Sequence, residues 1–330
     1  MKNYNSVLYL GILVLFISLV GCKNLKKEKV SAIVSSNKLE DNFNLVFNVA
    51  MNEEQTDYDV WHLNLKTKVK TNITKNPKDV AWAYGADNKV LFISDRDTCV
   101  RCIYLYEMNP DGTGIRKITD FQLRDSWLSL RKNGTEIILN PSRKVDSAFY
   151  IIDRNGKVFD KIYTGLKYAN DPCFSPDGNS IAFRGGDQIS KRVEGFNEAI
   201  YVMDLNTRVK KRITNYPVND TSAPWYAYKA GVPKWHPTEN FISYQSYQNG
   251  QYNLFAVTPD GSKQWKLTNN SQAEGYHSWS PDGKWLALEI TDSIESNFDI
   301  ALMNWVTKEI EIFENQEYVF EQGPVFVAIK

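Results

Sequence analysis

The sequence predicts an all-β fold, a six-bladed β-propeller of four-stranded antiparallel blades. A first repeated signature, an aromatic residue with Ser-Pro-Asp-Gly and an apolar strand, starts at Phe174 and Trp279 and, degraded, at Trp235. A second signature is an apolar strand, a tight turn and a basic strand ending in Leu-Thr or Ile-Thr. Its turns centre on Thr67, Gly112, Gly156, Thr207, Gly261 and Thr307. They recur about every 45 to 55 residues, the period of propeller blades.

Side chains of two kinds alternate along each copy of the repeat, which predicts strands rather than helices. Ile200 and Val202 alternate with Tyr201 and Met203, and Asp-Gly or Asn-Gly pairs separate such runs. Period-two alternation closed by these turns is typical of β-hairpins. Helical periodicity is found only at the extreme N-terminus.

The two ends of the repeat region predict how the ring closes. The turn of the first signature, which follows the opening strand of a blade, occurs five times, whereas the turn of the second signature occurs six times. One blade therefore lacks its opening strand. The first blade starts at its second strand, 42–50, and the chain ends with 322–330, whose Gly-Pro-Val-Phe resembles the Asp-Pro-Cys-Phe from Asp171. We expect the C-terminal strand to complete the N-terminal blade, because closure removes exposed sheet edges.

These repeats resemble the TolB-like, WD40-like family of six-bladed propellers. The resemblance covers residues 42–330, and its Ser-Pro-Asp-Gly turns indicate the fold. They do not indicate function, because propellers host unrelated activities. In TolB an additional N-terminal α/β domain precedes the propeller, whereas here residues 23–41 follow the predicted export signal, so the architecture differs.

The N-terminus predicts export and lipid anchoring. Residues 1–22 have a basic start and a short apolar segment, and they read as a signal peptide. The ending Leu-Val-Gly-Cys resembles a bacterial lipobox, which would make Cys22 the lipidated residue; a plain cleavage site with an incidental cysteine is the alternative. Residues 23–41 are a polar tether. Lysines rather than acidic residues follow Cys22, which favours the periplasmic side of the cell envelope, and the outer membrane over the inner.

The composition and the cysteines limit which partners and which chemistry the sequence indicates. Lys plus Arg equals Asp plus Glu at 39 each, so the net charge gives no indication of a nucleic-acid partner. We also expect a monomer. Cys99 and Cys102 are expected to form a local disulfide in an oxidising compartment. Two free thiols, or a metal half-site or redox role, are the alternatives. Cys173 is expected to be a buried free thiol.

Loop lengths predict that one face of the ring is functional. In an antiparallel blade the first and third connections lie on one face, and these are short. The other face carries the long segments 94–102, 184–199 and 215–231, and long loops on a rigid scaffold concentrate binding residues.

Particular side chains are candidates for binding. The partner-binding candidates are Arg192, Phe196, Tyr216, Trp225, Tyr226 and Tyr228. Aromatic loop residues can anchor a protein or stack on sugars, or they can instead cover the propeller's own channel. The candidates to face the channel, from opening strands, are Trp82, Trp127, Asp171, Lys234 and His277.

No catalytic constellation is recognisable in the sequence. The three histidines, His62, His236 and His277, share no ligand spacing and are expected to be structural. No phosphate loop, HExxH or G-x-S-x-G motif is present, and no metal or cofactor is expected, although a pair of acids for glycoside hydrolysis stays possible. We expect a lipid-anchored, non-catalytic propeller that binds a protein or envelope component through the long-loop face. A glycan-binding or glycan-cleaving lipoprotein is the alternative, and a purely structural envelope role is a third.

Overall fold

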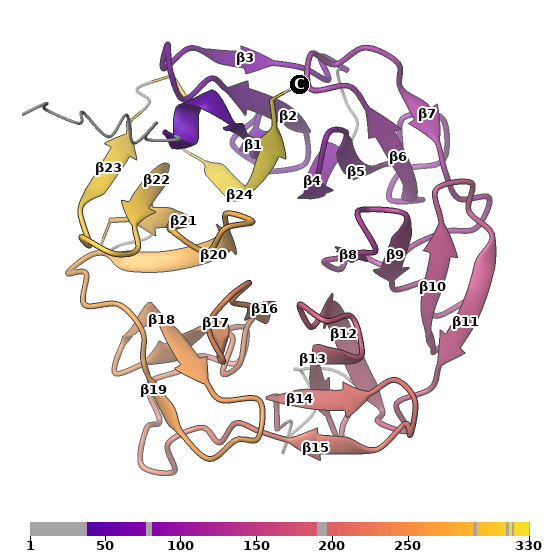
Figure 1. Cartoon of the computed structure of the whole chain (residues 1–330), viewed down its shortest axis with the longest axis vertical. Coiled ribbons are helices and arrows are strands. Elements are labelled where there is room, and N and C mark those ends of the chain that lie inside the picture. Colours follow the sequence, from indigo (N-terminus) through magenta and orange to yellow (C-terminus); the bar gives the residue numbers. More distant parts are fainter. Residues whose placement is uncertain are drawn as a thin grey trace, which may run out of the picture. The chain divides into compact units, whose positions relative to one another are not determined.

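The computed structural model describes residues 38–76, 81–189, 197–292, 296–314, 317–318 and 320–329. Six four-stranded antiparallel sheets surround a centre, as predicted (Figure 1). The described residues contain one helix, the short η1 (Leu39–Asp41), and no helix in them has the length and apolar character needed to cross a membrane.

Each blade runs from an inner strand to an outer one. The first blade is β24 (Glu321–Ala328), β1 (Phe43–Ala50), β2 (Tyr58–Leu63) and β3 (Lys70–Asn72). The second is β4 (Ala81–Ala86), β5 (Val90–Ser94), β6 (Tyr104–Met108) and β7 (Arg116–Lys117). The third is β8 (Ser129–Arg131), β9 (Glu136–Leu139), β10 (Phe149–Asp153) and β11 (Val158–Ile162).

The remaining blades follow the same order. The fourth is β12 (Tyr168–Phe174), β13 (Ser180–Gly186), β14 (Ala199–Asp204) and β15 (Lys210–Arg212). The fifth is β16 (Lys234–Trp235), β17 (Ile242–Gln248), β18 (Gln251–Val257) and β19 (Gln264–Lys266). The sixth is β20 (Ala273–Trp279), β21 (Trp285–Thr291), β22 (Phe298–Asn304) and β23 (Ile310–Phe313).

The C-terminal strand closes the ring at the predicted seam. β24 pairs with β1 from Phe43 opposite Ala328 to Val49 opposite Glu321, so the first blade takes its inner strand from the other end of the chain. In the same blade Lys70 Nζ lies 2.7 Å from the buried carboxylate of Glu321. The predicted closure is therefore confirmed.

The geometry of the Ser-Pro-Asp-Gly turns explains why these residue types recur in the repeat. Asp177 accepts a hydrogen bond from the backbone N–H of Asn179 at 3.0 Å and from Ser175 Oγ at 2.6 Å. Gly178 follows at φ +72°, a conformation that favours glycine because other residues carry a Cβ. The motif thus fixes a tight turn between the inner strand and the next one.

Several inner strands carry β-bulges that change which side chains face the centre. The register shifts between Ala83 and Gly85 in β4, between Asn170 and Cys173 in β12, and between Glu274 and His277 in β20. A bulge adds a residue to one strand and re-aims the side chains around it. The bulged positions supply side chains to the central cavity described next.

Candidate functional site

The loop 215–231 joins β15 to β16 on the long-loop face, and hydrogen bonds fix it at both ends. Near its start, the Asp220 carboxylate accepts from the backbone N–H of Asn249 at 2.8 Å. Near its end, Glu198 Oε2 accepts from the N–H groups of Lys229 at 3.1 Å and Ala230 at 3.3 Å. This long loop is therefore held to the neighbouring strands although it contains no regular element.

The four aromatic candidates in this loop divide into two pairs. Trp225 and Tyr226 are 62% and 60% exposed, and their ring centroids lie 5.7 Å apart. Tyr216 instead donates from its hydroxyl to the Tyr247 carbonyl, and the Tyr228 hydroxyl lies 3.2 Å from that of Tyr276 in the centre. One pair thus faces outward, and the other packs into the protein.

Three candidates lie outside the described residues. These are Arg192 and Phe196 of the loop between β13 and β14, and Cys22.

A cavity of about 110 Å³ lies at the centre, and aromatic and charged side chains line it. Its lining residues are Trp82, Tyr84, Asp125, Ser126, Trp127, Asn170, Asp171, Arg184, Tyr228, Val232 and Tyr276. Of the channel candidates, Trp82, Trp127 and Asp171 are therefore here. Tyr84, Asp171 and Tyr276 come from the bulges of β4, β12 and β20.

His277 is not among the residues that line this cavity. Its side chain is 2% exposed, and Nε2 lies 2.7 Å from Ser243 Oγ of the neighbouring blade. Burial lowers the pKa of His277 to about 3, so the imidazole is neutral. The register shift in β20 aims the adjacent Tyr276 into this cavity instead.

Three buried charged residues, Arg184, Asp171 and Glu198, form a triad at one wall of the cavity. Arg184 of β13 binds the Asp171 carboxylate through Nε, and its NH1 lies 2.9 Å from Glu198 Oε1. Burial alone would lower the pKa of Arg184, but the carboxylate of Asp171 and its neighbours hold that pKa well above the usual value. Asp171 also accepts from the backbone N–H of Trp127 at 2.8 Å, so the triad links the third and fourth blades.

A second acid, Asp125, lines both this cavity and a neighbouring one of about 340 Å³. Burial raises its pKa, and its carboxylate accepts a hydrogen bond from the Tyr84 hydroxyl. Arg101, in the segment between Cys99 and Cys102, lines the neighbouring cavity. The structure joins these two cysteines in a disulfide with their Cα atoms 5.1 Å apart.

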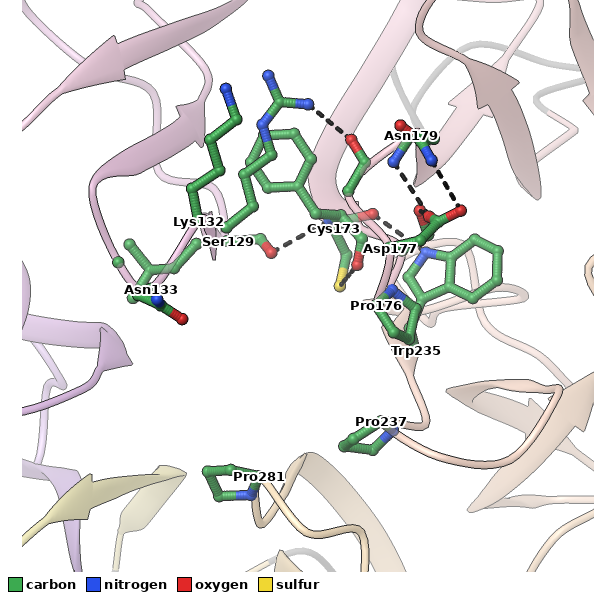
Figure 2. Close-up of a pocket in the computed structure, with 16 residues that line it drawn as sticks. Ser129, Lys132, Asn133, Cys173, Pro176, Asp177, Asn179, Trp235, Pro237 and Pro281 are labelled. Atoms are coloured by element: carbon green, nitrogen blue, oxygen red, sulfur yellow. Dashed lines mark hydrogen bonds between the residues drawn. The ribbon is translucent and has the colours of Figure 1, made fainter.

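The short-turn face holds the larger cavity, which the sequence did not indicate. It measures about 910 Å³, and the turn residues of the third and fourth blades line it together with Trp235, Pro237 and Pro281 (Figure 2). Cys173 is a free thiol, as expected, but it is only partly buried and lines this cavity. The signal available in the sequence was the proline that follows the inner strands of the fourth, fifth and sixth blades, since Pro176, Pro237 and Pro281 all line this cavity.

Metal ligands do not gather in the described part of the chain, where no three His, Cys, Asp or Glu residues form a group that could hold an ion. His236 is buried and makes structural contacts, with Nε2 3.1 Å from the Gly283 carbonyl. His62 lies on β2.

Comparison with known proteins agrees with the ring. No family model matches the chain. A TolB protein of the Tol-Pal system from Francisella tularensis is 29% identical over 80 residues, which are 24% of this chain and 18% of the relative. The match therefore spans less than a fifth of that relative's length.

Solved structures share the fold over most of the chain. TolB from Acinetobacter baumannii superposes with a TM-score of 0.64 at 14% identity, covering 86% of this chain and 66% of the other. The chain has the fold of the TolB propeller. An oligogalacturonate lyase in complex with manganese also superposes, with a TM-score of 0.50 at 11% identity over 76% of this chain and 71% of its own. Enzymes and TolB proteins thus share this ring, and the fold by itself decides no activity.

Proposed function

We propose that this protein is a lipid-anchored, non-catalytic propeller of the bacterial envelope that binds a protein partner through its long-loop face. The observation that carries the proposal is the adjacent pair of exposed aromatic rings, Trp225 and Tyr226, on a loop fixed at both ends. Val218 of the same loop is 95% exposed and is a third exposed apolar side chain of this loop.

The physical basis is the combination of apolar area and preorganisation. Trp and Tyr rings supply large contact areas with few rotatable bonds, and they are enriched among the residues that dominate binding energy. Asp220 and Glu198 already hold the loop, so a partner has less loop entropy to remove on binding.

The envelope location is supported by the sequence around Cys22 and by similarity to TolB proteins of the Tol-Pal system. We propose that acyl chains on Cys22 hold the protein at the membrane, on the periplasmic side and at the outer rather than the inner membrane, with the residues from 23 up to η1 as tether. The protein acts as a monomer, requires no cofactor and does not bind nucleic acid.

The test is photo-crosslinking in cells, with a photoreactive amino acid at position 218 of the full-length protein. We expect one dominant crosslinked partner, lost when Trp225→Ala and Tyr226→Ala are combined. Phe159→Ala removes an aromatic ring that is 50% exposed on β11, and this control should keep the crosslink. A crosslink that survives the double substitution would show that this loop is not the binding surface. Cys22→Ser should release the protein into the soluble fraction.

Glycan binding or cleavage is the second candidate, and the same Trp225 and Tyr226 pair favours it because exposed aromatic faces stack on sugar rings. Screening the purified protein against bacterial envelope polysaccharides, with detection of cleavage products, separates the two. Saturable glycan binding that depends on Trp225 would favour a glycan ligand over a protein partner.

A further inference from the structure

The cavity on the short-turn face leads into an inner compartment of about 210 Å³ that brings together an amine, a thiol and a hydroxyl. Lys234 of β16, Cys173 of β12 and Ser278 of β20 line it, so three blades contribute. Cys173 and Trp235 line both the inner and the outer compartment. The two therefore form one funnel.

Lys234 is the cation that lines the inner compartment. Its Nζ lies 3.9 Å from the centroid of the Trp127 ring, a cation–π contact, and no carboxylate forms an ion pair with it in the described part of the chain. The titratable groups that act on it are Cys173 and Asp171 from β12 and His277 from β20. Burial lowers the pKa of Lys234 to about 8, so the amine is mostly protonated at neutral pH.

Ser278 supplies an unused hydrogen-bonding group at the same place. Its side chain is 8% exposed, and within the described residues its Oγ has no hydrogen-bond partner. Buried hydroxyls in folded proteins almost always have partners, so an orphan that lines a cavity calls for one from outside the chain.

The charge of the lining favours an anion. Arg131, Lys132 and Lys234 line the funnel, and Lys132 lies at its edge in Figure 2. Arg131 and Lys132 are already paired with Glu136, at 2.7 and 2.6 Å, so among the described residues Lys234 is the lining cation without an ion pair. Among the described residues, Asp177 is the one carboxylate residue that lines the two compartments. Its oxygens accept hydrogen bonds from within its own turn, including that from the Asn179 N–H. An anion in the inner compartment would therefore meet a lysine without facing an unengaged carboxylate.

We propose that the funnel binds a small oxyanion group, a carboxylate or a phosphate, which pairs with the Lys234 ammonium and accepts a hydrogen bond from the Ser278 hydroxyl. Charge-assisted hydrogen bonds of this kind are the stronger ones in proteins. The inner compartment holds several times the roughly 30 Å³ that a water molecule occupies, so a phosphate or a short carboxylate fits. The site is on the face opposite the loop 215–231, and it does not depend on the proposed partner.

The test uses the Cys173 thiol as a reporter of occupancy in the full-length protein in detergent. Its alkylation rate is measured by peptide mass spectrometry in inorganic phosphate, in succinate and in chloride at matched ionic strength. We expect saturable protection of about tenfold by phosphate, by succinate or by both, and the arms show which anion the site prefers. Lys234→Met should abolish the protection. Lys284→Met, an exposed lysine in a turn of the same face, should leave it unchanged.

A measurement on the unmodified protein covers the case in which Lys234→Met does not fold. Because the ammonium titrates near pH 8, the anion concentration that gives half-protection should rise about tenfold or more between pH 7 and pH 9.5. Protection no greater than that in chloride would overturn the proposal. So would equal protection in folded Lys234→Met, or protection of the unmodified protein that is independent of pH.

Discussion

Glu289 offers a quantitative test of how the ring is closed. This residue of β21 is 2% exposed, and its Oε1 accepts a hydrogen bond from the Gly323 N–H of the closing strand β24 at 2.6 Å. Burial raises the pKa of Glu289 to about 8, against two backbone hydrogen bonds, from Gly323 and Tyr276, that lower it. The folded protein therefore takes up a proton at this side chain when it forms near neutral pH.

The sign of the effect follows from linkage. Between the ordinary pKa of 4.5 and the folded value of about 8, the folded state holds a proton that the unfolded state has lost. The contribution of Glu289 to the free energy of unfolding is therefore complete below pH 4.5. Between pH 4.5 and pH 8 it falls by about 1.4 kcal/mol per pH unit. From pH 5 to pH 8 the loss is about 3.5 kcal/mol. Glu289→Gln removes the titration and hence this slope.

The assay is urea unfolding of the original protein and of Glu289→Gln at pH 5, 6, 7 and 8. The glutamine amide also faces a backbone N–H donor, but that cost does not depend on pH and shifts the whole curve without changing its slope. Glu309→Gln, an exposed residue of the same blade, is the control and should give a curve parallel to that of the original protein. A difference between original and Glu289→Gln that stays constant from pH 5 to pH 8 would refute the reasoning.

Two further substitutions test the packing of the ring. Phe326→Ala on the closing strand removes a 6% exposed ring and should lower the free energy of unfolding by about 3 to 5 kcal/mol, measured by urea unfolding; a loss below about 1 kcal/mol would contradict a packed seam. Arg184→Met leaves the buried carboxylates of Asp171 and Glu198 without their cation and should cost about 3 to 5 kcal/mol. Adding Asp171→Asn and Glu198→Gln should recover part of that loss, and a single variant as stable as the original protein would argue against the triad.

The sequence by itself determined the number of blades and the seam, because both follow from short-range chemistry. The turn at Asp177 and Gly178 is fixed by a side-chain hydrogen bond and a glycine within a few residues, and each such turn marks one pair of strands. The closing strand 322–330 could be predicted from its likeness to the inner strand at Asp171, since a blade that lacks its inner strand needs one such partner.

Only the tertiary structure decided which side chains meet at the centre and where the cavities lie. His277 and Tyr276 are neighbours in the sequence, and it is the register shift in β20 that buries the first against Ser243 and turns the second inward. Lys234 and Ser278 come from different blades, so no local pattern could place them in one funnel. Side-chain direction in a bulged strand depends on pairing across the sheet, and pairing is a property of the closed ring rather than of any repeat within it.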